Sequence, residues 1–294
     1  MATNQQVADA AAVAGPVAPQ WPMPVETFLK GPWLEPSDVL LMRQRSSTFA
    51  SLVRLFTGSF FSKAAMVFLV PHREKDFDTA FVIEAAFEGV DLTDLNSFVL
   101  SKEKRFVIAV KRVECDWFDL EHRHLVRGFM LNYIKADYDY GKLFDNLWAS
   151  LKGAQFFLLR LVLGPHWALR QITKRRPAER LNKFIGPGLV QWGYFEATKF
   201  LVDNKLAPAE RLDDVVFRER LFDERAKGKI TGFDEDDLLG VTAEDIAKSS
   251  RLSWKYAIVD GQVYEVGSGG EFYDLLRRLR RLRLRGLTRT EAQA

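Results

Sequence analysis

The chain has 294 residues, of which 47% are hydrophobic and 28% are charged. This length and composition suit a globular protein with a substantial core. The net charge of +3 is too small to indicate nucleic-acid binding by itself. A single cysteine excludes an intrachain disulfide and a metal site made of several cysteines.

The first part of the chain, residues 1–30, is rich in alanine, proline and glutamine and has little hydrophobic periodicity. We expect an extended arm there, with a disordered tail as the alternative. The first residues lack the basic start and apolar core of a signal peptide, and no run reaches the ~18 apolar residues of a membrane span. We therefore expect a cytoplasmic protein.

Regular structure is expected to begin near residue 39. Short apolar runs, rich in β-branched or aromatic residues, predict strands over 39–42, 64–70, 80–85 and 106–112. Apolar residues at helical spacing predict helices over 48–56 and 120–135.

The second half of the chain contains a helix with a defined start. Pro187 suits the first turn of a helix, so we expect a helix over 187–202 with Gly186 as its cap. Residues 209–245 are acidic and should be helical in pieces. The Asp260-Gly261 pair lies between two apolar runs and predicts a β-hairpin.

Two distant stretches carry a resemblance to a known family. The first, from Phe56 to Val67, leads into an apolar strand, and the second, Phe184-Ile185-Gly186-Pro187-Gly188-Leu189-Val190-Gln191-Trp192, opens a helix. With Asp38-Val39-Leu40-Leu41 and Val82-Ile83-Glu84-Ala85, they resemble the circularly permuted papain-like amidases of the NlpC superfamily, of the YiiX and YaeF type. The resemblance covers residues 36–266. It implies an α+β fold in which helices pack on a small, mainly antiparallel sheet.

The resemblance also identifies three positions of a catalytic site. In that family a histidine follows the serine at Ser62, an acidic or polar residue occupies the place of Glu84, and a cysteine begins the later helix. Here Lys63 replaces the histidine and Gly186 replaces the cysteine. Glycine supplies no nucleophile, and lysine, with an ordinary pKa near ~10.4, is a poor base at pH 7. The resemblance therefore implies an inactive relative.

These positions have alternative roles in binding. Lys63 and Glu84 either form an ion pair that fills the former site, or Lys63 holds a carboxylate or phosphate. Gly186 and Gly188 leave backbone N–H groups at a helix N-terminus, which suits either an anion pocket or a capped structural helix.

We expect no cofactor and no metal. Cys115 stands beside two carboxylates, which should weaken it as a nucleophile. His122 and His124 are two residues apart on a predicted helix and point in different directions. His166 stands alone.

The chain departs from the family pattern at Ser37, where glycine is usual, and by a helical insertion over 143–183. The part of the insertion from 154 to 176 combines an apolar run with flanking basic residues. It could lie on an anionic membrane surface, with packing on the core or on another subunit as the alternative.

A basic amphipathic helix is expected over 267–294. Its apolar stripe is Phe272, Leu275, Leu276, Leu279 and Leu282. The remaining surface carries six arginines, Arg277, Arg278, Arg280, Arg281, Arg283 and Arg285. The candidate partners are, in order, an acidic protein surface, anionic lipid and nucleic acid. Nucleic acid comes last because no recognisable motif for it is present.

The sequence thus predicts an N-terminal arm (1–30), a papain-like domain (31–266) and a basic C-terminal helix (267–294). We expect a catalytically inactive relative of papain-like amidases. It would act as a binding or structural subunit of a larger assembly and contact a protein partner through the C-terminal helix and the N-terminal arm. The alternative is an active amide or ester hydrolase, or an acyltransferase, with a rebuilt site at a membrane surface.

Overall fold

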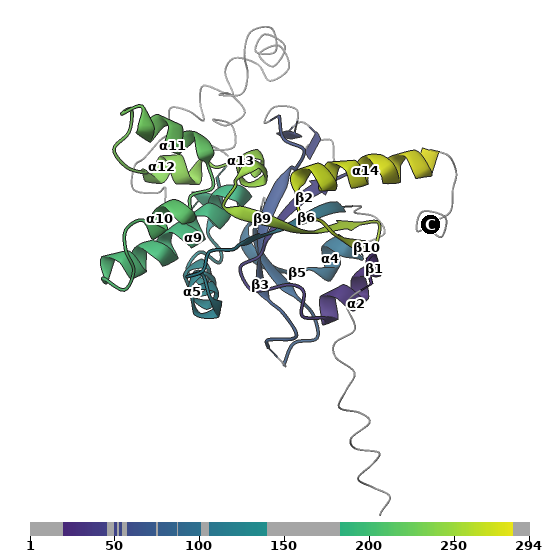
Figure 1. Ribbon diagram of the computed structural model, residues 1–294. Helices are drawn as coiled ribbons and strands as arrows, with labels where there is room; N and C mark the ends of the chain where they lie inside the picture. The colour runs from purple at the N-terminus through teal and green to yellow at the C-terminus, as the bar shows by residue number, and fades with distance from the viewer. Residues whose placement is uncertain are drawn as a thin grey trace, which may run out of the picture.

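The fold is α+β, as expected, and is built on one antiparallel sheet (Figure 1). This computed structural model describes residues 20–45, 50–51, 53–54, 58–74, 76–86, 88–100, 106–139 and 183–284. In the described part of the chain the main sheet has eight strands in the order β1-β10-β9-β6-β2-β3-β4-β5. The sheet is therefore larger than the small one expected from the sequence.

The strands follow the apolar runs of the sequence closely. Their bounds are β1 Met23–Pro24, β2 Val39–Gln44, β3 Lys63–Leu69, β4 Phe81–Ala86, β5 Gly89–Asp94, β6 Phe106–Val113, β9 Leu252–Val259 and β10 Gln262–Glu265. The predicted hairpin is confirmed, because β9 and β10 pair across Asp260 and Gly261. Both residues have positive φ, 53° and 77°, as a two-residue turn of type I′ requires.

Helices occupy both faces and one end of the sheet. They are α2 Val25–Lys30, α4 Asn96–Val99, α5 Leu120–Leu131, α9 Gly186–Asp203, α10 Arg211–Asp214, α11 Glu219–Ala226, α12 Glu235–Leu239, α13 Ala243–Lys248 and α14 Gly269–Leu284. The cap of α9 is Ile185, and Gly186 is already its first helical residue, which corrects the expected cap by one position.

Alternation along the strands creates two cores. On one side, here named the α9 face, Ala64 and Met66 of β3 pack with Leu189 of α9. On the other side, the α2 face, Ala65 and Val67 pack with Phe28 of α2, as does Phe98 of α4. Neighbouring residues of one strand thus belong to different cores.

The N-terminal segment joins the fold earlier than the sequence suggested. Residues 23–24 form β1 and pair with β10, and α2 follows directly, with Val25 and Phe28 fully buried. The expected arm over 1–30 is therefore wrong for residues 23–30, because their few apolar side chains complete the core of the α2 face. Residues 1–19 lie outside the described part of the chain.

A second, two-stranded sheet marks the two ends of the expected insertion. Asp137–Tyr138 (β7) pairs in parallel with Lys183–Phe184 (β8). The chain therefore leaves and rejoins the body at neighbouring places. Residues 140–182 lie outside the described residues, and with them both the predicted helical insertion over 143–183 and the candidate membrane stretch over 154–176. None of the described helices has the length and apolar character needed to cross a membrane.

A buried lysine ties the sheet to the helical region. Lys111 of β6 is fully buried, and its ammonium donates to the carbonyls of Ile246, Ala247 and Ser249 at 2.9, 2.8 and 3.1 Å. These carbonyls lie at the C-terminal end of α13, where a helix lacks internal donors. Burial lowers the pKa of Lys111 to about 7. We infer a structural role, because the bonds fix α13 against the sheet.

Candidate functional site

Lys63 and Glu84 form an ion pair on the α2 face. Glu84 is the partner of Ala65 in the register of β3 and β4, so Lys63 reaches it diagonally from two residues away. The ammonium contacts Glu84 Oε2, and the Glu84 side chain is only 7% exposed. The ammonium also lies 5.3 Å from the ring centre of Phe98. Of the two roles considered for Lys63, the geometry shows the ion pair.

Gly186 lies against the backbone of β3, on the other side of the sheet. A Cβ atom placed on Gly186 would be 2.6 Å from the carbonyl oxygen of Ala64, which is closer than real contacts allow. The absence of a side chain at this position is therefore a packing requirement. A cysteine here would have to displace either α9 or β3.

The four residues considered for anion binding are divided between the two faces. Lys63 and Glu84 belong to the α2 face, whereas Gly186 and Gly188 open α9 on the α9 face. A Cβ on Gly188 would be 2.4 Å from the carbonyl oxygen of Leu239, so α12 closes over the first turn of α9. The structure does not bring these four residues into a common pocket.

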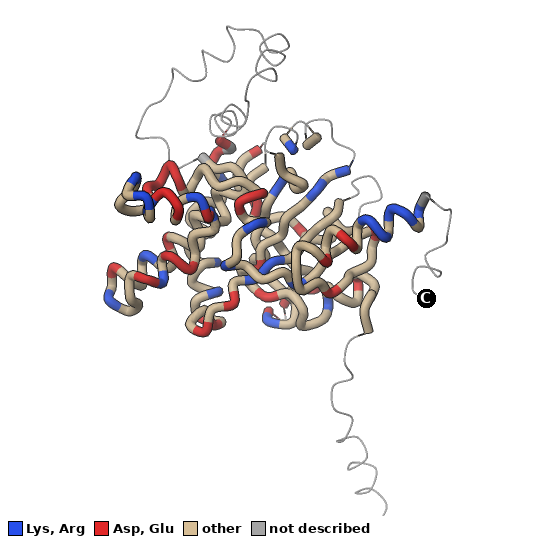
Figure 2. The backbone as a smooth tube through the Cα atoms, turned by 45° about the horizontal axis from the view of Figure 1, so that its top comes forward, with Lys and Arg blue, Asp and Glu red and all other residues tan. Residues whose placement is uncertain are grey.

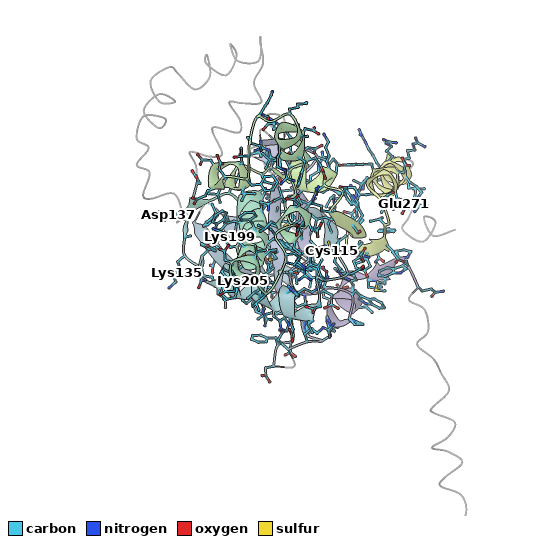
Figure 3. All side chains as sticks on the ribbon, turned by 60° about the vertical axis from the view of Figure 1, so that its left-hand side comes forward. Cys115, Lys135, Asp137, Lys199, Lys205 and Glu271 are labelled. Carbon is cyan, nitrogen blue, oxygen red and sulfur yellow. The ribbon has the colours of Figure 1, made fainter. Side chains whose placement is uncertain are left out.

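Neither Cys115 nor His122 belongs to a candidate metal site among the described residues. Cys115 lies in the body of the molecule (Figure 3), where burial, and then Asp214 and Asp116, raise the pKa of its thiol. His122 Nδ1 lies 2.6 Å from Asp119 Oδ1 at the start of α5. Among the described residues no three side chains of His, Cys, Asp or Glu are placed to share a metal ion. His166 lies outside them.

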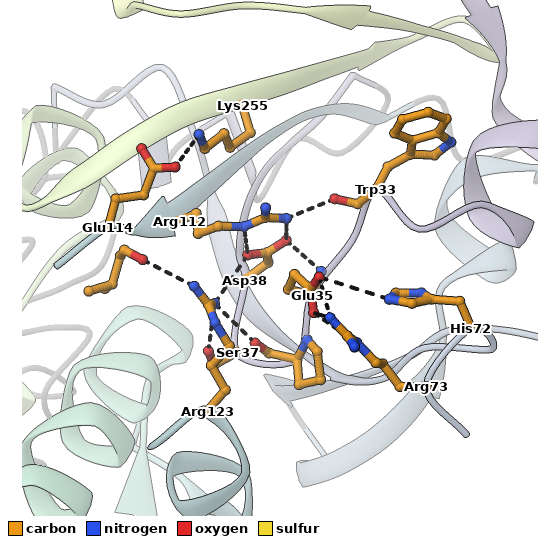
Figure 4. Close-up of polar contacts among 12 residues, drawn as sticks. Trp33, Glu35, Ser37, Asp38, His72, Arg73, Arg112, Glu114, Arg123 and Lys255 are labelled. Carbon is orange, nitrogen blue, oxygen red and sulfur yellow. Dashed lines mark hydrogen bonds and ion pairs between the residues drawn. The ribbon is translucent and has the colours of Figure 1, made fainter. Parts of the chain in front are cut away.

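The most conspicuous polar group is a buried carboxylate that sequence reasoning did not single out (Figure 4). Asp38 is fully buried, and Arg112 Nε and Nη2 donate to its two oxygens at 2.7 and 2.6 Å. The N–H of Glu35 adds a third bond at 2.9 Å. Burial raises the pKa of Asp38, while Arg112 acts in the opposite direction.

A second layer extends this network to the helices. Arg123 of α5 lies 3.8 Å from Asp38 Oδ1 and donates to the carbonyl of Val113 at 3.2 Å. The hydroxyl of the fully buried Tyr194, in α9, donates to the carbonyl of Ser37 at 2.5 Å. The oxygens of Asp38 are engaged from several sides, so we infer that this residue holds the loop before β2 against β6 and α5.

Ser37 stands at a position where the resemblance described above would place glycine. Its φ is 68°, in the left-handed region that glycine adopts most easily. Serine adopts this conformation here, where Tyr194 donates a hydrogen bond to its carbonyl and Arg123 donates one to its hydroxyl oxygen. The serine before Asp38 is the sequence signal from which this network could have been found.

The arginines of α14 remain on the surface. Phe272 and Leu275 are buried in the core of the α9 face, and the helix exposes Arg277, Arg278, Arg280, Arg281 and Arg283. Arg285 lies outside the described residues. Figure 2 shows these basic residues at the opposite end from α11 and α12. Residues 203–248 hold thirteen acidic and eight basic residues, so the described part of the chain has an acidic end and a basic end.

The comparisons with known proteins give a weak similarity to a solved structure. No family model matches the chain, and no curated protein matches it. Among solved structures, the metalloprotein YiiX from Escherichia coli O157:H7 is similar with a TM-score of 0.41 and 14% sequence identity. The alignment covers 76% of this chain and 96% of YiiX.

Proposed function

We propose that this protein is a non-catalytic binding or structural subunit on a frame related to the papain-like amidases. The observation that carries the proposal is the contact of Gly186 with β3. The position where the resemblance places the nucleophile has no side chain, and the Ala64 carbonyl oxygen occupies the space that one would need. Acyl transfer by covalent catalysis requires a nucleophile and a base within hydrogen-bond reach of each other.

The surroundings of the other two positions support the same proposal. Lys63 forms an ion pair with Glu84, and both residues lie across the sheet from the start of α9. A group on α9 could not exchange a proton with Lys63 through the sheet. The site therefore lacks both of its reacting groups and also the geometry that would unite them.

The proposed partner is an acidic protein surface that contacts the exposed arginines of α14. Phe272 and Leu275 are buried in the core, so the exposed surface of α14 consists mainly of charged side chains. Arginine side chains bind carboxylates through two parallel hydrogen bonds. The N-terminal arm, residues 1–19, is the second proposed contact.

Cys115 provides a test against an active hydrolase with a rebuilt site. Because burial and two carboxylates raise the pKa of its thiol, little thiolate exists at neutral pH, and labelling by iodoacetamide should be slow. The labelling rate should rise with pH beyond the ordinary thiol pKa of about 8.5. Cys115→Ala should change no measured activity. Rapid, stoichiometric labelling at pH 7 would show an activated nucleophile and contradict the proposal.

The arginine face of α14, here defined as Arg277, Arg278 and Arg281, is tested by affinity capture from the native source. We expect a co-purifying protein to be lost when Arg277, Arg278 and Arg281 are replaced by glutamate, and to be weakened by salt, because exposed charges are screened. The matched control replaces the exposed Lys199, Lys205 and Lys227 by glutamate, which changes the net charge equally at the other end of the molecule. If both variants lose the partner alike, the arginine face is not the contact.

A further inference from the structure

Five arginines from three parts of the chain meet at one end of the sheet. Asp260, in the β9–β10 turn, pairs with Arg45 at 2.9 Å and also with Arg283 of α14. Arg43 lies two residues before Arg45, at the end of β2, and Arg54 and Arg280 lie close enough to Arg43 to repel it. Here these residues are named the arginine cluster: Arg43, Arg45, Arg54, Arg280 and Arg283.

Aromatic packing holds Arg43 beside α14. Its guanidinium lies 4.2 Å from the ring centre of Phe60, within the range of cation–π attraction. Phe60 in turn meets Phe272 and Tyr273 of α14 edge to face, with ring centres 5.9 and 5.4 Å apart. The end of β2 and the arginine-bearing helix are thus joined by a packed layer.

Arg54 is positioned by hydrogen bonds. Its Nη1 donates to the carbonyl of Gln44 at 2.9 Å and its Nη2 to Ser51 Oγ at 2.8 Å. Both acceptors are neutral, so these bonds fix the guanidinium without cancelling its charge. Arg43, Arg45 and Arg54 are half-buried, whereas Arg280 and Arg283 are exposed. Three arginines of the cluster are thus packed against the body, and the two arginines of α14 are open to solvent.

Among the described residues, the arginine cluster carries more positive than negative charge. The five guanidinium groups carry five positive charges, and the carboxylate of Asp260, which pairs with two of them, carries one negative charge. Burial lowers the pKa of Arg43, and repulsion from Arg54, Arg45 and Arg280 lowers it further. Arginine nevertheless stays protonated in proteins. A bound anion would relieve this repulsion.

We propose that the arginine cluster binds a phosphate group. A phosphate monoester carries nearly two negative charges and three acceptor oxygens, and the planar guanidinium fork matches its geometry. A carboxylate brings one charge and two oxygens. The inference goes beyond the proposed function, because it assigns a ligand to residues of β2 and of the helical turn at Arg54 that lie outside the arginine face of α14.

The test is a calorimetric titration of the full chain with pyrophosphate. We expect saturable binding that weakens roughly tenfold when Arg43 and Arg54 are both replaced by glutamine, because charge-assisted hydrogen bonds are lost. Arg280→Gln is a second variant, exposed and therefore harmless to folding, and it should weaken binding as well. The charge-matched control, Arg277→Gln with Arg278→Gln, should bind like the unchanged protein.

Vesicles identify the source of the phosphate. Co-sedimentation with phosphatidylcholine vesicles that contain phosphatidic acid, but not with pure phosphatidylcholine, indicates a lipid headgroup; pyrophosphate binding without co-sedimentation indicates a soluble ligand. The proposal is overturned if neither probe binds, if the control variant loses binding equally, or if poly-glutamate binds the cluster more tightly than pyrophosphate. Partner capture through Arg277, Arg278 and Arg281 can succeed or fail independently of these results.

Discussion

Replacing Asp38 by asparagine is expected to lower the free energy of unfolding by about 3–5 kcal/mol, the usual cost of removing one member of a buried ion pair. The substitution keeps the shape of the side chain but leaves the guanidinium of Arg112 without its counter-charge. Asp38 is fully buried, so water cannot replace the lost interaction. Arg112 Nη2 also donates to the carbonyl of Trp33 at 2.7 Å, which means that the loop before β2 should loosen together with the pair.

The measurement is urea denaturation at neutral pH, with Glu35→Gln as the control. Glu35 lies in the same loop but pairs with Arg73, whose side chain is 40% exposed, so its removal should cost no more than about 1 kcal/mol. Arg112→Met should also be costly, and the double variant should cost less than the sum of the two, because the single variants each leave a charge unpaired. Equal costs for Asp38→Asn and Glu35→Gln would contradict the assigned role.

Replacing Gly186 by alanine is expected to cost about 1–3 kcal/mol, as overpacking in a close-packed region does. The new methyl group would meet the carbonyl oxygen of Ala64 at 2.6 Å, and that oxygen belongs to a central strand that cannot move freely. The matched control is Gly128→Ala. Gly128 also lies within a helix, but a Cβ there would meet nothing within 4 Å. This control should stabilise the protein by roughly 0.5–1 kcal/mol.

Gly186→Cys tests the functional side of the same contact. Restoring the thiol should destabilise the protein at least as much as alanine does, and it should produce no hydrolysis of ester or amide substrates, because Lys63 lies on the opposite face of the sheet. Thermal unfolding and an esterase assay report the two effects separately. A stable Gly186→Cys variant with esterase activity would show that the catalytic frame is intact and that our assignment of the two faces is wrong.

The strands were predictable where apolar runs end at clear turns. The Asp260-Gly261 pair defined its hairpin, and Pro187 defined the start of α9 to within one residue. Strand β5 was missed because Gly89-Val90-Asp91-Leu92-Thr93-Asp94 is half polar, as an edge strand with one solvated side can be. Strand β1 was missed because its two residues, one of them proline, pair only through a hairpin more than 200 residues later.

The candidate site was only partly predictable, for a physical reason. The ion pair of Lys63 and Glu84 was one of the two roles that the sequence left open for Lys63. It did not reveal that α9 packs on the face of Ala64, one residue away from Lys63, because periodicity does not tell which face a distant helix covers. The burial of Asp38 likewise depends on Arg112, 74 residues away, and the arginine cluster gathers residues from three separate segments.

The separation of acidic and basic residues seen in Figure 2 has a consequence for how the protein meets other molecules. Within the described part of the chain, the acidic helical end and the arginine-bearing end form an electric dipole, which an external field can orient before contact. Near a negatively charged object this charge separation favours orientations in which α14 leads, and such orientations raise the fraction of productive collisions. This orientation should fade as ions shorten the reach of the field, which is about 10 Å at 0.1 M salt.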